Sequence, residues 1–296
     1  MGQNKDGTFT EVRKIVARDV DVNNKLKMSA LFAIVQETAN EQCVEFGCGW
    51  SQLMENYNAC YILSRMRFEM KKHPGAGDTV VFRTWPNKNA KAIFTRYFTV
   101  ESLDGEVYGS AVSQWALFNV EKRSVIRPSE CNIQFPEIIG VEEPFVLPKG
   151  NLYPVDAFEN NILRSKSKAP EYTDFDYNGH VNNARYIEWV ENVLPEEIFI
   201  NNNHISVIDI KYKHEISFRE FSKLDENEKI VTMQCTKNDD GDYYIRSILP
   251  DGREGVNYLS YSCIFSIFKT FFKILCKCLV VIMCMYIYYH LIFLPN

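Results

Sequence analysis

The stretch that decides the fold is Asp174-Phe-Asp-Tyr-Asn-Gly-His-Val-Asn-Asn-Ala-Arg-Tyr186. Two aspartates, three asparagines and one histidine lie within ten residues, directly before an apolar pattern of helical period. These side chains can transfer protons or donate hydrogen bonds, and the start of a helix adds free backbone N–H groups. The stretch therefore predicts a site for proton transfer and oxyanion binding at a helix N-terminus.

An altered copy of this stretch lies in the first half of the chain, as Asp19-Val-Asp-Val-Asn-Asn-Lys-Leu26. It keeps both aspartates, the first asparagine and the final aliphatic residue at a constant displacement of 155 positions. Lys25 stands where the second copy has His180. A repeated unit with a single histidine indicates two copies of one fold and one active site.

The segments around both copies follow the same order. Apolar residues at three- and four-residue steps predict helices over 28–46 and about 183–199. Strand-like runs occupy 9–20, 61–70, 79–85, 92–100, 107–120, 205–216, 228–237 and 242–249. The pattern predicts an α+β fold in which each half wraps an antiparallel sheet around one long helix, and the halves pack as a pseudo-dimer.

Five prolines between 128 and 154 argue against a helix or a central strand there, because proline supplies no N–H donor. We therefore expect an N-terminal domain over 1–127 with the degenerate site and the acyl-chain side, and a linker over 128–154. The C-terminal domain over 155–255 would carry the catalytic residues. A hydrophobic tail follows over 256–296.

Composition narrows the function. A net charge of −5 gives no basic surface for nucleic acid. The nine cysteines are scattered without the pairing typical of zinc sites, so no metal is expected. The N-terminus has no signal or transit pattern. We expect a cytoplasmic protein with reduced thiols.

The stretch from Asp176 to Tyr186 resembles the Asp-x-Asn-x-His-x-Asn-Asn motif of the acyl-acyl-carrier-protein thioesterases of plants and bacteria, which have a double hot-dog fold. Downstream, Tyr212-Lys-His-Glu215-Ile resembles their Tyr-Arg-Arg-Glu-Cys element. The resemblance covers about residues 9–254. It implies that Asp176, Asn178, His180 and Glu215 form the catalytic set.

The resemblance also implies the reaction, which is release of free fatty acid from acyl carrier protein without a cofactor. The family's cysteine is Ile216 here, which argues against a thiol mechanism. His180 and Glu215 would activate water, Asp176 would orient the imidazole, and Asn178 would donate to the thioester oxygen. Turn formation and helix capping are the plain alternative for Asp176 and Asn178.

Alternatives stay open at this point. The leaving group could be coenzyme A instead of the carrier protein, or the chain could be a non-catalytic acyl-binding regulator. Acyl-chain length and oligomeric state, monomer or homodimer, are not fixed by the sequence. The tail from about 256 has three interpretations: a membrane anchor, a packed helix, or out-of-frame translation, which is the one favoured here. If the tail is out of frame, the second sheet lacks its closing strand unless residues 256–264 supply it.

Overall fold

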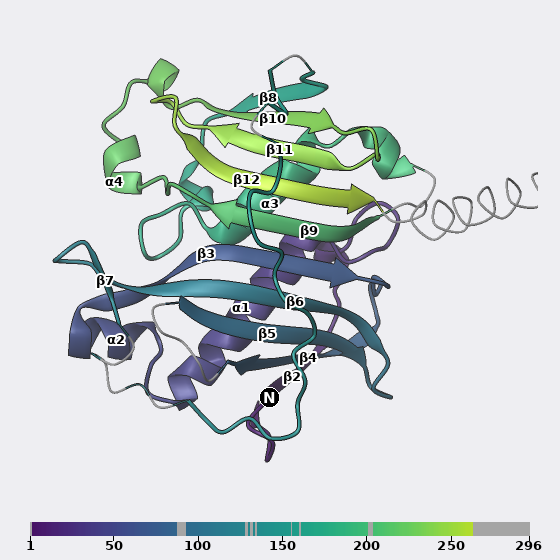
Figure 1. The fold of residues 1–296 in the computed structure, drawn as a ribbon, viewed down its shortest axis with the longest axis vertical. Helices are drawn as coiled ribbons and strands as arrows, with labels where there is room; N and C mark the ends of the chain where they lie inside the picture. Colours follow the sequence, from purple (N-terminus) through teal and green to yellow (C-terminus); the bar gives the residue numbers. More distant parts are fainter. Residues whose placement is uncertain are drawn as a thin grey trace, which may run out of the picture.

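The computed structural model describes residues 2–87, 93–127, 130, 133, 135–154, 156–159, 161–200 and 204–262. The described strands form one twelve-stranded sheet in the order β1-β2-β4-β5-β6-β3-β9-β12-β11-β10-β8, with β7 paired to β6. All pairings among these strands are antiparallel. Figure 1 shows the first half of the chain in the lower part of this sheet and the second half in the upper part.

The strands of the first half are β1 (Gly2–Gln3), β2 (Phe9–Lys14), β3 (Ala59–Met70), β4 (Thr79–Pro86), β5 (Ile93–Ser102), β6 (Val107–Asn119) and β7 (Ser124–Ile126). Those of the second half are β8 (Arg164–Lys168), β9 (Ile205–Tyr212), β10 (Val231–Lys237), β11 (Tyr243–Ile248) and β12 (Glu254–Ser262). The helices are α1 (Met28–Glu45), α2 (Trp50–Tyr57), α3 (Asn183–Val193) and α4 (Phe218–Phe221). The predicted architecture, one long helix and one antiparallel meander per half, is confirmed.

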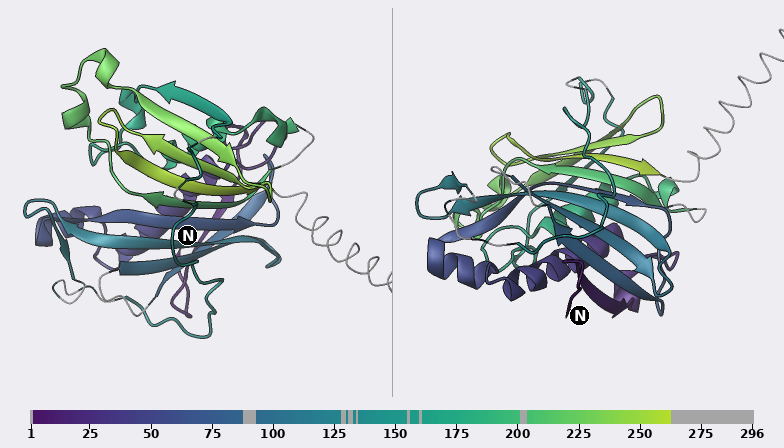
Figure 2. Two further views of the ribbon diagram at one scale, coloured as in Figure 1. Left: turned by 45° about the horizontal axis from the view of Figure 1, so that its top comes forward. Right: turned by 60° about the horizontal axis from the view of Figure 1, so that its bottom comes forward.

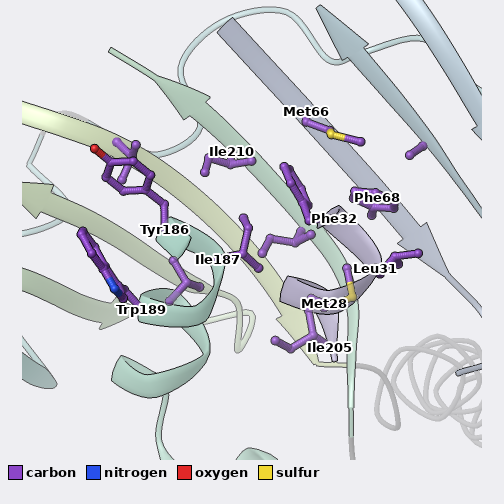
Figure 3. Packing of buried hydrophobic residues seen from close by; sticks show 14 of the residues in the cluster. Met28, Leu31, Phe32, Met66, Phe68, Tyr186, Ile187, Trp189, Ile205 and Ile210 are labelled. Atoms are coloured by element: carbon purple, nitrogen blue, oxygen red, sulfur yellow. The ribbon is translucent and has the colours of Figure 1, made fainter. Parts of the chain in front are cut away.

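The core lies between the sheet and the two long helices, α1 and α3. Both helices lie on the same face of the sheet and contact each other (Figures 1 and 2). Figure 3 shows side chains of both helices meeting those of β3 and β9: Met28, Leu31, Phe32, Met66, Phe68, Tyr186, Ile187, Trp189, Ile205 and Ile210. Because full burial of one such side chain contributes about 1.5–3 kcal/mol, this shared core holds the two halves together.

The loops before α1 and α3 repeat the same backbone pairing at the displacement of 155 positions. Val20 pairs with Leu26 in the first loop, and Phe175 pairs with Val181 in the second. A 3₁₀ turn precedes each loop, at Ala17–Asp19 and at Tyr172–Asp174. The internal repeat read from the sequence is therefore confirmed in the backbone.

The two half-sheets join where β3 pairs with β9, in a register that places Arg65 opposite Lys211 and Arg67 opposite Asp209. The Arg65 guanidinium donates to both carboxylate oxygens of Asp209, at 2.8 Å and 2.6 Å, and both residues are buried. Arg67 Nη1 donates to the same carboxylate at 3.2 Å. A buried carboxylate between two guanidiniums thus ties one half to the other.

Several predicted boundaries differ from the structure. The helix expected over 183–199 ends at Val193, because Leu194 precedes Pro195 and takes an extended ψ of 146°. The strand expected over 9–20 ends at Lys14, and the one expected over 205–216 ends at Tyr212. The sequence did not indicate α2 or β8 at all.

The region 128–154 follows an irregular path where it is described, and part of it packs on Trp85, Tyr97 and Val112 on the outer face of the sheet. The predicted tail boundary at 256 falls inside β12, which pairs with both β9 and β11, so the second sheet has its closing strand. The expected features of 263–296 lie outside the described residues. None of the helices described for this chain has the length and apolar character needed to cross a membrane. The domain boundaries stay a prediction.

Candidate active site

The loop from Asp176 to His180 is held in shape by the Asp176 carboxylate. Its Oδ1 accepts hydrogen bonds from the backbone N–H groups of Asn178, at 2.9 Å, and His180, at 3.5 Å. The backbone of Asp176 also accepts from Gly179 and donates to His180, each at 2.9 Å. Gly179 has a φ of 76°, a conformation that glycine adopts without steric cost. These bonds fix the direction in which His180 leaves the loop.

His180 and Glu215 are brought together, as the sequence predicted. His180 Nε2 lies 3.4 Å from Glu215 Oε1, and the two side chains are 36% and 55% exposed. Backbone pairing sets this approach: Val181 donates to the carbonyl of Ile216, and Phe218 donates to that of Gly179. An imidazole and a carboxylate at this separation, both open to solvent, can share a proton taken from water.

Glu215 lies just beyond β9 and not within a strand, which corrects the expectation that a neighbouring strand carries it. The ladder ends at Tyr212, and the next two backbone N–H groups, of Lys213 and His214, both donate to the carbonyl of Gly255. The chain thereby turns away from the sheet, and the Glu215 side chain reaches the loop before α3.

A cavity of about 340 Å³ adjoins the loop, between α1, the sheet of the first half and the start of α3. Two of the four predicted residues, Asp176 and Asn178, line it, whereas His180 and Glu215 are not among its lining residues. Its lining is mixed: polar side chains come from Gln36, Glu37, Asn40, Thr95, Arg96, Asp176, Asn178, Asn182 and Asn183, and an apolar and aromatic part comes from Ala33, Ala39, Trp50, Pro86, Phe94, Trp115 and Phe135. Such a lining suits an acyl chain entering beside the His180 loop.

Thiol chemistry has little support at this site. Ile216, where the family has cysteine, is buried and uses its carbonyl to pair with Val181. Burial, together with the nearby carboxylates of Glu215 and Asp176, raises the pKa of the Cys60 thiol to about 11. The Cys60 thiol is therefore protonated at neutral pH and is a poor nucleophile.

The corresponding place in the first half has the same backbone and different chemistry. Asp21 Oδ1 accepts from the backbone N–H groups of Asn23 and Lys25, each at 2.9 Å, as Asp176 does in the second half. Lys25 Nζ lies 3.3 Å from Nδ1 of His204. The rings of His73 and His204 lie with centroids 4.7 Å apart and are tilted by 58° to each other, and both residues are half-buried.

Sequence reasoning missed two residues at the site. Asn182 caps α3, since its Oδ1 accepts from the backbone N–H of Ala184 at 2.9 Å, and it lines the cavity. Gln36 lines the cavity from α1, and its buried Nε2 has no hydrogen-bond partner within the described part of the chain. The Asn-Asn pair before the helix was a signal for Asn182. Nothing in the local sequence distinguishes Gln36.

Two family models match the chain. The acyl-ACP thioesterase N-terminal domain matches residues 6–131, and the acyl-ACP thioesterase C-terminal domain matches residues 160–246. The chain therefore belongs to the acyl-ACP thioesterase family, and its fold is the double hot-dog. The resemblance read from the sequence is confirmed.

Among curated relatives, the chain is similar to a chloroplastic acyl-[acyl-carrier-protein] hydrolase of Cuphea viscosissima, with 25% identity over 81% of this chain and 58% of the relative. It is also similar to a chloroplastic oleoyl-acyl carrier protein thioesterase of Arabidopsis thaliana, with 29% identity over 68% of this chain and 59% of the relative. The chain thus spans less than two thirds of the length of these relatives.

Solved structures show the same fold. The 12:0-ACP thioesterase from Umbellularia californica matches with a TM-score of 0.70 and 19% identity, covering 88% of this chain and 99% of that one. An acyl-ACP thioesterase from Bacteroides thetaiotaomicron matches with a TM-score of 0.68 and 22% identity, covering 87% and 98% of the two chains. At this identity the likeness concerns the fold.

Proposed function

We propose that the chain is an acyl-[acyl-carrier-protein] hydrolase that releases free fatty acid and so terminates acyl-chain elongation. The observation that carries the proposal is the His180–Glu215 pair, 3.4 Å apart just before α3, in the loop next to a cavity whose lining is partly apolar and aromatic. Family membership supports the reaction class, and the names of the curated relatives support acyl carrier protein as the thiol carrier.

In the proposed reaction, a water oxygen attacks the thioester carbonyl carbon while His180, paired with Glu215, takes the proton. The carbonyl oxygen becomes negative and is stabilised by hydrogen-bond donors at the start of α3 and by the Asn178 carboxamide. When the carbonyl re-forms, the C–S bond breaks, and the proton held by His180 passes to the leaving thiolate. The products are a fatty acid and the free thiol of the carrier.

Steady-state hydrolysis of acyl-carrier-protein thioesters tests this proposal. We expect His180→Ala and Glu215→Ala each to lower kcat by roughly 10²–10⁴-fold, the range of a general acid–base contribution. Lys25→Ala is the matched control, because it removes the side chain at the equivalent position of the first half. Wild-type rates in both site variants would exclude these residues from the mechanism.

The carrier is a separate part of the proposal. A panel of carrier-protein and coenzyme A thioesters of graded chain length compares kcat/KM for the two leaving groups. A preference for coenzyme A would assign the chain to acyl-coenzyme A hydrolysis, whereas tight acyl binding without turnover would make it a regulator. The cytoplasmic location expected from the sequence stays a prediction.

A further inference from the structure

Gln36 places an unused hydrogen-bond donor in the proposed active site. It projects from α1 of the first half and lines the cavity together with Asn182 and Asn183, which begin α3 of the second half. Its Nε2 is buried without a hydrogen-bond partner among the described residues. A buried amide without a partner costs free energy, so its retention in the cavity wall calls for a ligand that accepts from it.

The other half of the molecule contains the equivalent contact with an acceptor in place. Glu191 lies 155 positions after Gln36, just as the first residue of α3, Asn183, lies 155 positions after Met28, the first residue of α1. The Glu191 carboxylate accepts from the backbone N–H groups of Met28, at 2.8 Å, and Ser29, at 3.3 Å. A side-chain oxygen of Glu191 therefore occupies the N-terminus of α1.

The N-termini of α1 and α3 differ in whether an acceptor binds their first backbone N–H group. The residue before α1 is Lys27, which provides no side-chain cap, so Glu191 supplies the acceptor from across the interface. The side chain of Asn182 before α3 accepts from the Ala184 N–H, and within the described residues no acceptor is bonded to the N–H of Asn183. A neutral donor, Gln36, stands where the first half has the carboxylate.

We propose that Gln36 is a substrate-contacting residue whose Nε2, with the Asn183 N–H, binds the carbonyl oxygen of the thioester. This inference rests on the proposed function and deepens it. As water adds, the carbonyl oxygen gains a negative charge, which the neutral amide stabilises without losing a proton. The substrate oxygen then takes the place that a Glu191 oxygen holds at α1.

Two substitutions test the proposal through kcat, KM and thermal stability of the full chain. Gln36→Leu keeps the volume and removes the donor, so we expect kcat to fall about 10²–10³-fold, the typical loss for one oxyanion donor, with KM changed less than about threefold. Gln36→Glu reproduces the first-half arrangement. Its carboxylate would accept from Asn183, so we expect a raised melting temperature together with a kcat loss of at least about 10²-fold.

Glu191→Gln is the control, because it alters the same contact at the helix start that has no proposed chemistry, and kcat should stay within about twofold. The proposal is overturned, and the proposed function stands, if the wild type hydrolyses acyl-carrier-protein thioesters and Gln36→Leu or Gln36→Glu keeps kcat within about threefold. A stabilised and inactive Gln36→Glu supports the proposal even where Gln36→Leu fails to fold.

A binding measurement separates this inference from the proposed function. If the wild type hydrolyses no acyl-carrier-protein thioester, the function fails, and Gln36 is tested with two stable analogues of the acylated carrier. One has an amide in place of the thioester, and the other a thioether without a carbonyl. Tighter binding of the amide by the wild type, lost in Gln36→Leu, supports the contact, and equal affinities overturn it.

Discussion

At the scale of single residues, the Asp176 carboxylate does a structural task that its twin Asp21 repeats. Each uses Oδ1 to accept two backbone N–H groups of its own loop. The first-half loop has no imidazole to orient, so loop order alone accounts for this geometry in Asp21. That Asp176 also orients the His180 ring stays a prediction.

Paired substitutions separate the two roles of Asp176. We expect Asp176→Ala and Asp21→Ala each to lower the free energy of unfolding by about 0.5–2 kcal/mol, the usual cost of losing such a cap, as measured by urea unfolding. Only Asp176→Ala should lower kcat, because His180 follows its loop. Asp176→Asn keeps the acceptor oxygen and removes the charge. A large kcat loss in Asp176→Asn with an intact fold would show that the charge itself acts on the imidazole.

The sequence predicted His180 and Glu215 as partners through their motifs, and the 3.4 Å approach agrees with that prediction. It did not predict Gln36, for a physical reason. Gln36 is close to the site only because α1 of one half reaches the start of α3 of the other, and no local pattern encodes a contact between residues so far apart in the chain.

At the scale of elements, the sequence predicted where the two long helices begin, but it did not predict which residues stabilise their ends. Helical periodicity indicated α1 within a residue at each end. No local side chain caps α1, and the acceptor at its start comes from Glu191. The edge strand β8 was missed because its sequence, Arg-Ser-Lys-Ser-Lys, lacks an alternating apolar face, and its pairing with β10 decides its conformation.

The contribution of the Glu191 cap on α1 to the free energy of unfolding can be measured. Glu191→Ala removes the acceptor of two N–H groups at the positive end of the α1 dipole, so we expect a loss of about 0.5–2 kcal/mol in unfolding free energy. The rate constant kcat of the folded fraction should be unchanged. Urea unfolding measures the change in unfolding free energy, and kinetics at one temperature measure kcat. An unchanged unfolding free energy would mean that water replaces the carboxylate at no cost.

At the scale of the whole molecule, the buried Asp209 carboxylate joins the half-sheets through Arg65 and Arg67. Asp209→Ala leaves two guanidiniums without their shared partner in the interior. Removing one partner of a buried ion pair typically costs about 3–5 kcal/mol, so we expect a loss of that size in urea unfolding. Glu69→Ala, which removes a half-exposed partner of Arg67, should cost at most about 1 kcal/mol.

The altered site of the first half makes stability depend on pH. Burial, together with the neighbouring His73 and Lys25, lowers the pKa of His204 to about 4, and burial also lowers the pKa of His73. In the unfolded chain both imidazoles titrate near 6.5. The unfolded state therefore binds more protons between about pH 4 and 6.5, so stability is complete above this range and falls as the pH drops through it.

Urea midpoints at pH 5 and pH 7.5 measure this dependence. His204→Gln should reduce the difference between the two midpoints, because the substituted side chain does not titrate. His214→Gln provides the comparison at an exposed histidine. A wild-type protein with equal midpoints at both pH values would contradict the assignment of His73 and His204 as neutral groups of the folded state.

Because the two repeats lie in one chain, finally, a mutation in one repeat leaves the other unchanged. In an assembly of two identical chains, every codon change appears in both copies. A carboxylate that caps the N-terminus of the long helix in one copy would therefore cap it in both. Here positions 36 and 191 are separate codons, as are positions 25 and 180. One copy can thus specialise in holding the molecule together while the other keeps an unsealed helix start for turnover, a division of labour that an obligatory homodimer has no genetic means to reach.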